Sequence, residues 1–352
     1  MSLPPNRRGL PVLPIELLLE IIDSFAQVSP ATPVQVLYRY PTPEKYLERR
    51  SVIGALSQTC RALRGRLLPV LWRDLQAFAS DAHVFAKSWR GGWREWRKNV
   101  TKELTRQCEI VTFRSPDVAQ YVETVTVALT DFATDAMSLF VHTLTRLPNL
   151  KTLHIVHLAY DCFTMLNVFG KWKFLTVKTM VLPLVPLSAG ALLRSCPNVE
   201  HFVCGGRSTG AHSRRMESSF LGMLQDAFPN LRSLRGLDIS DADDMTSLLT
   251  RCPRLEHLCI LVRSTTDNVS DGADQTGSYP AVIAPLRNLQ NLRSARIEFQ
   301  ITDIDFIVAS LRAIKPMLKG PVPPKEERLE VRLPPNLEET AHDRLRKYID
   351  HP

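Results

Sequence analysis

One spacing of apolar residues recurs along the chain and limits what it can fold into. Apolar side chains stand at positions i, i+3 and i+5 in successive segments, which begin at Val122, Leu150, Val177, Val199, Leu255 and Leu292. A further copy, at Leu231, has the first two of these positions only. The residues at i+3 and i+5 are two apart, so they fall on the same face if the segment is a strand. Because a single short strand cannot bury that face alone, we expect the segments to pack beside one another.

The distances between the copies indicate the kind of array. Successive first positions are 28, 27, 22, 32, 24 and 37 residues apart. Leucine-rich repeats carry the same L-x-x-L-x-L pattern with about 20–29 residues per unit. The two longest intervals contain the loop-like stretches 205–219 and 263–279. We therefore predict a degenerate leucine-rich-repeat solenoid over residues 121–335, an α/β fold with parallel strands on the inner face and helices outside.

Details of the array support this interpretation but leave one register open. Several copies share a lead-in with Pro, such as Leu147-Pro148-Asn149-Leu150 and Cys252-Pro253-Arg254-Leu255. The copy at Leu231 fits the pattern equally well if it is shifted to Leu234. Apolar residues three or four apart predict covering helices at 136–147, 187–195, 219–227, 243–251 and 303–318. We expect a last strand at 329–333 and a capping helix or tail over 336–352.

The N-terminal segment has a different character. Residues 13–22 are strongly apolar, and Pro14 suits the first position of a helix, where its missing N–H costs nothing. At helical spacing, four apolar residues fall on one face of this helix: Leu17, Leu18, Ile21 and Ile22. A helix this short cannot bury that face by itself. Either a second helix or another protein must cover it.

Two further blocks complete a recognisable unit. After an insertion at 28–50, the chain reads LSQTCRALR from Leu56 and LPVLWRDL from Leu68. Together with LPIELLLEII from Leu13, this order resembles the F-box, the helical module by which substrate receptors dock on the Skp-type adaptor of cullin-based ubiquitin ligases. It is most similar to the large fungal set of F-box-like proteins. We assign the F-box-like module to residues 10–76.

The resemblance implies a non-catalytic substrate-recognition subunit of a ubiquitin ligase. Its module would bind adaptor and cullin, and its repeats would hold an unknown protein target near the conjugating enzyme, which raises the effective concentration of the target. The implied adaptor-binding residues are Leu13, Pro14, Ile15, Leu17, Leu18, Ile21, Ile22, Leu56, Leu63, Leu71 and Trp72. The alternative is a ligase-independent repeat scaffold whose helical start has lost adaptor binding.

Two other regions are candidate binding surfaces. Loops that leave the carboxyl ends of parallel strands share one rim, so target contacts are expected at Arg207, Arg214, Arg215, Asp267 and Asp271. The connector at 77–120 is basic and carries Trp89, Trp93 and Trp96 at helical spacing. Such a face could bind nucleic acid, but we expect it to pack between the helical module and the repeats.

Other functions lack a signal in the sequence. No nucleophile elbow, phosphate loop or zinc-binding helix motif is present, so we predict no enzymatic activity and no cofactor. Seven cysteines without a CxxC pair indicate neither a disulfide framework nor a zinc site, and no stretch is long and apolar enough for a membrane helix. We expect a protein of the cytoplasm, the nucleus or both. The net charge of +8 favours acidic partners.

Overall fold

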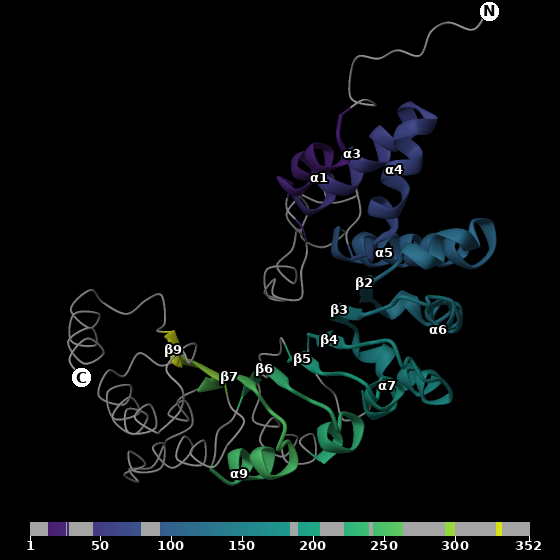
Figure 1. Cartoon of the computed structure of the whole chain (residues 1–352). Helices are drawn as coiled ribbons and strands as arrows, with labels where there is room; N and C mark the ends of the chain where they lie inside the picture. Colours follow the sequence, from purple (N-terminus) through teal and green to yellow (C-terminus); the bar gives the residue numbers. More distant parts are fainter. Residues whose placement is uncertain are drawn as a thin grey trace, which may run out of the picture. The chain divides into compact units, whose positions relative to one another are not determined.

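The fold is an α/β arrangement of parallel strands and helices that forms two compact units (Figure 1). The first unit spans Met1–Pro183 and the second spans Leu184–Pro352. The computed structural model describes residues 13–25, 27, 45–78, 92–183, 189–204, 222–238, 242–262, 293–299 and 329–332.

Three helices open the first unit. They are α1 (Ile15–Asp23), α3 (Lys45–Thr59) and α4 (Arg61–Trp72). Pro14 caps α1 from the position before its first turn, where its carbonyl accepts the N–H of Leu18 at 3.2 Å. Cys60 is extended, which separates α3 from α4, and its sulfur accepts the N–H of Leu63 at 3.5 Å. The helical blocks predicted from the sequence are therefore helices, and α4 continues through Pro69.

Four parallel strands follow the helices in sequence order. They are β1 (Asp74–Ala77), β2 (Thr124–Leu129), β3 (Thr152–Leu158) and β4 (Thr179–Leu182). Their register aligns the middle apolar residue of each copy, so that Leu75, Val125, Leu153 and Met180 form one row. All four side chains are buried. Strand β1 crosses the predicted boundary between the helical module (10–76) and the connector (77–120), and it was not predicted as a strand.

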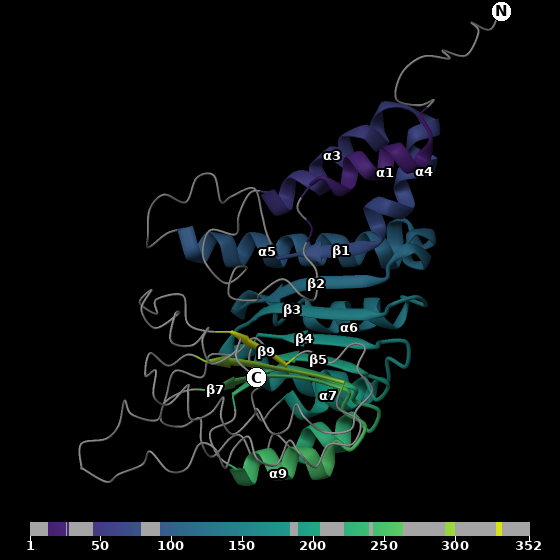
Figure 2. The same ribbon diagram turned by 60° about the vertical axis from the view of Figure 1, so that its left-hand side comes forward.

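Helices cover one face of these strands (Figure 1). They are α5 (Gly92–Glu109), the π-helix η3 (Ile110–Arg114), the 3-10 helices η4 (Pro116–Tyr121), η5 (Asp131–Ala133) and η6 (Tyr160–Lys171), and α6 (Met137–Thr145). Figure 2 shows α5 running along β1 and α6 beside β3. Helix α5 buries Trp96, Val100, Leu104 and Cys108, which are four residues apart and form its packing stripe.

The second unit repeats the same plan. Its elements are α7 (Gly190–Ser195), β5 (His201–Cys204), β6 (Ser233–Asp238), α9 (Ala242–Arg251), β7 (His257–Val262), β8 (Ser294–Phe299) and β9 (Leu329–Arg332), and residues 222–227 are also helical. The strands pair in parallel and in order from β5 to β9. Phe202, Leu234, Leu258 and Ala295 occupy one row, which extends to Leu329.

A bulge at Gly236 decides the register that the sequence left open. Arg235 pairs with Cys259, whereas the next aligned pair is Leu237 with Ile260, so Gly236 is the extra residue between them. Gly236 has φ of +77°, and a Cβ there would lie 1.8 Å from the carbonyl oxygen of Cys204. Glycine is therefore required, and the copy that begins at Leu231 carries its third apolar residue one position late.

The shared lead-ins form turns before the strands. The N–H of Leu150 bonds to the carbonyl of Leu147 at 3.5 Å, and the N–H of Leu255 bonds to that of Cys252 at 3.1 Å. A turn closed by such a bond accepts Pro at its second position, because φ of Pro is already near the required value. The predicted helices at 136–147, 187–195, 219–227 and 243–251 are each helical in their described parts. Those at 303–318 and 336–352 lie outside the described residues.

Candidate partner-binding site

Helix α1 presents three faces with different surroundings. Leu18 and Ile22 are fully buried, whereas Leu17 and Ile21 are 47% and 46% exposed. Leu19 and Asp23 line a cleft on a third side. Residues four apart on a helix stay on the same side, so each pair marks one face. The apolar surface predicted as a single face is therefore divided between an internal core and the protein surface.

The buried face of α1 completes a small core with α3 and α4. Leu18 and Ile22 pack in one cluster with Ile53, Leu63 and Leu67. Partly buried residues surround it: Ile15, Leu56, Cys60, Val70 and Leu71. Burying a Leu or Ile side chain contributes about 1.5–3 kcal/mol. The cluster therefore holds α1 in place without help from a partner and fixes the direction in which Leu17 and Ile21 point.

The predicted adaptor-binding residues divide in the same way. Leu18, Ile22, Leu63 and Trp72 are buried, so they support the surface rather than form it. Leu13, Ile15, Leu56 and Leu71 are half-buried. Pro14, Leu17 and Ile21 are exposed. The structure thus brings an exposed apolar patch together from α1 and the residue before it.

Trp96 is the tryptophan of the basic connector whose side chain the structure describes, and it lies in the interior. Trp96 is buried, and its ring meets that of His157 on β3 edge to face at 5.7 Å. The neighbouring Arg97 bonds to Asp131 at 2.9 Å. Trp89 and the side chain of Trp93 lie outside the described residues. Trp96 therefore packs α5 against the strands. Arg97 forms an ion pair with Asp131, which favours a packing role for this face over phosphate binding.

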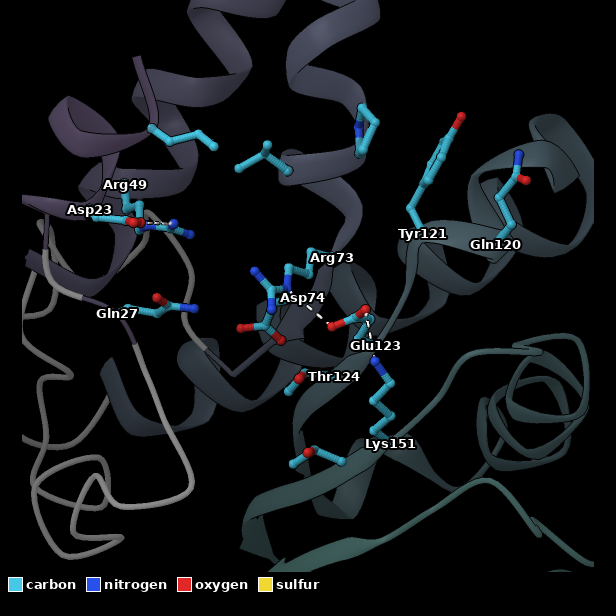
Figure 3. A pocket seen from close by; sticks show the side chains of 14 residues that line it. Asp23, Gln27, Arg49, Arg73, Asp74, Gln120, Tyr121, Glu123, Thr124 and Lys151 are labelled. Carbon is cyan, nitrogen blue, oxygen red and sulfur yellow. Dashed lines mark hydrogen bonds and ion pairs between the residues drawn. The ribbon is translucent and has the colours of Figure 1, made fainter. Parts of the chain in front are cut away.

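A charged cleft of about 750 Å³ lies between the three helices and the N-terminal ends of β1, β2 and β3. Figure 3 shows the side chains that line it, with Asp23, Gln27 and Arg49 on one side and Gln120 and Tyr121 on the other. Arg49 bonds to Asp23 at 2.9 Å. Leu19, Pro69 and Val70 add an apolar wall. The cleft thus combines charges with apolar surface from the helices.

Charges of alternating sign lie along the strand ends at the cleft. The Nε of Arg73 donates to Glu123 at 3.2 Å, and the Nζ of Lys151 donates to the other oxygen of the same carboxylate at 3.0 Å (Figure 3). The hydrogen bond from Lys151, followed by the nearby charge of Arg73, holds the pKa of Glu123 below its usual range despite some desolvation. A separate row in the second unit has the same order: Arg232 and Arg293 both pair with Glu256 at 3.5 Å.

The alternation follows from the backbone of the repeat. Glu123, Lys151 and the three residues of the second row each come directly after the first apolar residue of a repeat copy. Arg73 holds the equivalent place before β1, since its carbonyl accepts the N–H groups of Glu123 and Thr124. The carbonyl of Glu123 accepts the N–H groups of Lys151 and Thr152, and the carbonyl of Glu256 accepts those of Arg293 and Ser294. Equivalent residues therefore lie side by side in neighbouring strands, about 4.8 Å apart. At that separation, opposite charges attract and the correct register is favoured.

A deeper polar group joins α3 to β1. Arg50 donates to the carbonyl of Gln76 at 2.8 Å, and the carboxyl of Asp74 accepts from Gln76 at 2.6 Å and from Thr126 at 3.1 Å. Burial raises the pKa of Asp74 to about 6, against the opposing effect of these hydrogen bonds and of Arg50. Burial also lowers the pKa of Arg50. This group ties the helical module to the first strand.

The residues proposed for the loop rim cannot be placed. Arg207, Arg214, Arg215, Asp267 and Asp271 lie outside the described residues, so their role in target binding stays a prediction. Sequence reasoning missed the cleft residues Arg73, Glu123 and Lys151. The signal that could have found them is the alternating charge after the first apolar residue of successive copies.

Within the described part of the chain, no group of three or more His, Cys, Asp or Glu side chains could hold a metal ion. No helix among the same residues has both the length and the apolar character needed to cross a membrane. A comparison with family models and with curated proteins found no match for the chain.

Proposed function

We propose that the chain is a non-catalytic substrate receptor of a Skp-cullin-F-box type ubiquitin ligase. The helices α1, α3 and α4 act as an F-box-like module that docks on the adaptor, and the parallel strands with their covering helices act as a leucine-rich-repeat solenoid that binds a protein target. The order of the three helical blocks and the aligned L-x-x-L-x-L register support this proposal.

The observation that carries the proposal is the exposed pair Leu17 and Ile21 on a helix whose adjacent face is packed into a core. Two large apolar side chains in adjacent turns are about half exposed, although the same helix buries Leu18 and Ile22 completely. An apolar patch held rigidly at a surface suits a partner of matching shape, because association does not require the patch to be ordered first.

The test is capture of the Skp-type adaptor and the cullin by the full-length chain. We expect the wild type to retain both, and the double variant Leu17→Asp/Ile21→Asp to lose both, because two charges cannot be buried against an apolar surface. The matched control is Glu16→Gln/Glu20→Gln, which alters two exposed positions of the same helix and should retain the adaptor. Circular dichroism checks that every variant is folded.

A ligase-independent repeat scaffold is the alternative from a different class. The same capture experiment separates the two. If the folded wild type retains neither adaptor nor cullin, the substrate-receptor proposal is wrong and the scaffold is favoured.

A further inference from the structure

The turn between η6 and β4 carries two large apolar side chains at the protein surface. Trp172 is 41% exposed and Leu175 is 59% exposed. An apolar side chain that is exposed singly is common and needs no explanation. These two lie only three residues apart in the same turn, so they form a local apolar patch that is distinct from the exposed pair on α1.

Buried aromatic rings hold this turn in place. Phe174 lies between the two exposed residues and is itself buried, and its ring meets that of Phe169 at 6.2 Å. The ring of Phe169 also meets that of Phe140 on α6 at 6.2 Å. The N–H of Trp172 bonds to the carbonyl of Phe169 at 2.9 Å. The turn is therefore anchored at its centre, while Trp172 and Leu175 on either side of the anchor remain at the surface.

Cations surround the exposed pair, and carboxylates are scarce. Lys171 and Lys173 flank Trp172 in the sequence, and both are exposed. Residues 136–194 contain six Lys or Arg and one acidic residue, Asp161. That residue lies near the start of η6, whereas Lys171 ends it. The positive charge at the turn is therefore not offset by acidic residues of the same stretch.

A third cation lies in the neighbouring turn. Arg146 is exposed where the chain leaves α6 and leads into β3. Strands β3 and β4 begin side by side, because Thr152 pairs with Thr179, so the two turns that enter these strands are neighbours. Among the described residues, no carboxylate forms an ion pair with Arg146 or Lys171. Both charges are therefore available to a partner.

The edge changes character beyond α6. A hydrogen bond between two threonines joins η3 to α6, and Phe113 of η3 is exposed next to Arg114. Here, however, Arg114 pairs with Glu109 at 2.8 Å, and Asp117 is exposed nearby in the sequence. This part adds apolar surface but no excess of positive charge. The combination of apolar and basic side chains is confined to the turns after α6 and η6.

This combination favours a lipid surface over a protein as the partner. Trp prefers the boundary between water and hydrocarbon, and a neighbouring Lys can lay its stem along apolar surface while its ammonium reaches a phosphate. A second copy of the chain would bring like charges together and be repelled. A folded protein would need a matching pocket for each exposed apolar side chain, whereas a fluid bilayer adapts to them.

We propose that this surface docks on membranes that contain anionic lipid. We call it the basic turn surface, and its residues are Arg146, Lys171, Trp172, Lys173 and Leu175. The two apolar side chains enter the boundary between headgroups and acyl chains, and the three cations lie at the lipid phosphates and carboxylates. The docking is peripheral and does not rest on the proposed ligase function.

The test is sedimentation of the full chain with lipid vesicles. We expect vesicles of equal parts phosphatidylcholine and phosphatidylserine to bind at least about tenfold more tightly than vesicles of phosphatidylcholine alone. Arg146→Gln/Lys171→Gln should weaken binding to the anionic vesicles about 30-fold, because each basic residue near such a surface contributes about fivefold. Trp172→Ala/Leu175→Ala should weaken it at least about tenfold through lost apolar contact.

Matched controls remove the same kinds of group elsewhere. Arg61→Gln/Lys102→Gln removes two exposed cations from α4 and α5, and Leu17→Ala/Ile21→Ala removes two exposed apolar side chains from α1. Both variants should bind the anionic vesicles nearly as well as the wild type. Equal weakening in the controls and in the variants of the turn would mean general attraction by net charge and would overturn the inference, as would undetectable binding of the wild type.

Soluble polyglutamate separates a lipid partner from an acidic protein. If the wild type binds polyglutamate but not the anionic vesicles, the surface is suited to an acidic protein and the inference is wrong. Vesicle binding that is lost in Trp172→Ala/Leu175→Ala supports the inference, because a purely electrostatic partner does not require these two side chains.

Adaptor capture keeps this inference distinct from the proposed function. Trp172→Ala/Leu175→Ala should retain the adaptor, and Leu17→Asp/Ile21→Asp should retain the anionic vesicles. Adaptor capture without vesicle binding refutes membrane docking alone. Vesicle binding without adaptor capture supports membrane docking and refutes the proposed ligase role.

Discussion

Replacement of Gly236 by Ala is expected to disrupt the second unit severely. The residue has φ of +77°, which costs an L-residue about 1–2 kcal/mol. The new Cβ would lie 1.8 Å from the carbonyl oxygen and 3.0 Å from the carbonyl carbon of Cys204. Both atoms belong to the backbone of β5, so no side chain can move aside. Strands β5 and β6 must separate locally.

The expected loss follows from these contacts. If separation breaks two or three backbone hydrogen bonds at about 1 kcal/mol each, the free energy of unfolding of the second unit falls by about 3–5 kcal/mol in total. Amide hydrogen exchange followed by mass spectrometry measures this for each strand. Exchange of the β5 and β6 amides should become at least about 100-fold faster, because 1.4 kcal/mol corresponds to a factor of ten.

Gly54 and Gly65 provide the control for this prediction. Both lie inside helices and have nothing within 4 Å of the position that a Cβ would occupy. Alanine at either position should stabilise the first unit by about 0.5–1 kcal/mol, because glycine loses more backbone entropy in a helix. Unchanged protection of β5 and β6 in Gly236→Ala would refute the reasoning about the bulge.

Two further predictions concern buried side chains of the first unit. Leu18→Ala should lower the free energy of unfolding by about 3 kcal/mol and Leu17→Ala by less than about 0.5 kcal/mol, as measured by urea denaturation, since only Leu18 leaves a cavity; equal losses would contradict the division of the α1 surface. Burial lowers the pKa of His154 to about 4. Below about pH 6.5 the unfolded chain binds a proton at this imidazole and the folded chain does not, so the free energy of unfolding decreases as the pH falls from 6.5 towards 4. The total decrease is up to about 3 kcal/mol. His154→Leu should therefore reduce the difference between the urea midpoints at pH 7 and pH 5, and an unchanged difference would show that His154 is not the group responsible.

Much of the repeat architecture could be predicted because its signal is periodic. Val125, Leu153 and Met180 were placed at equivalent positions from spacing alone, and the structure pairs them in one row. The Pro-containing lead-ins are turns that precede strands. In both cases the pattern reflects a local requirement, either one buried strand face or one backbone angle, which is the same in every copy.

Strand β1 could not be predicted in this way. It has only four residues, Asp74–Ala77, and it follows α4 with one intervening residue. Its sequence continues the apolar block that was predicted to be helical. It is a strand because its backbone pairs with that of β2. The raised pKa of Asp74 likewise depends on burial between α3 and the strands, which no local pattern encodes.

The candidate site shows the same limit. Helical spacing placed Leu17, Leu18, Ile21 and Ile22 on one broad face, but it could not show where α3 and α4 would cover that face. Nor could spacing along the chain show that Arg73 and Lys151 lie on either side of Glu123 at a cleft. These residues are separated by dozens of positions and meet only after the strands have paired.

The sequence by itself determined the repeating strands, their covering helices and the helical start, because each is set by the period of its own apolar residues. The tertiary structure alone decided which apolar residues of α1 stay at the surface, that Gly236 shifts one register, and that three charged strand ends line a cleft. These features depend on packing between segments that are distant in the chain, and packing is a property of the folded unit, which no single segment contains.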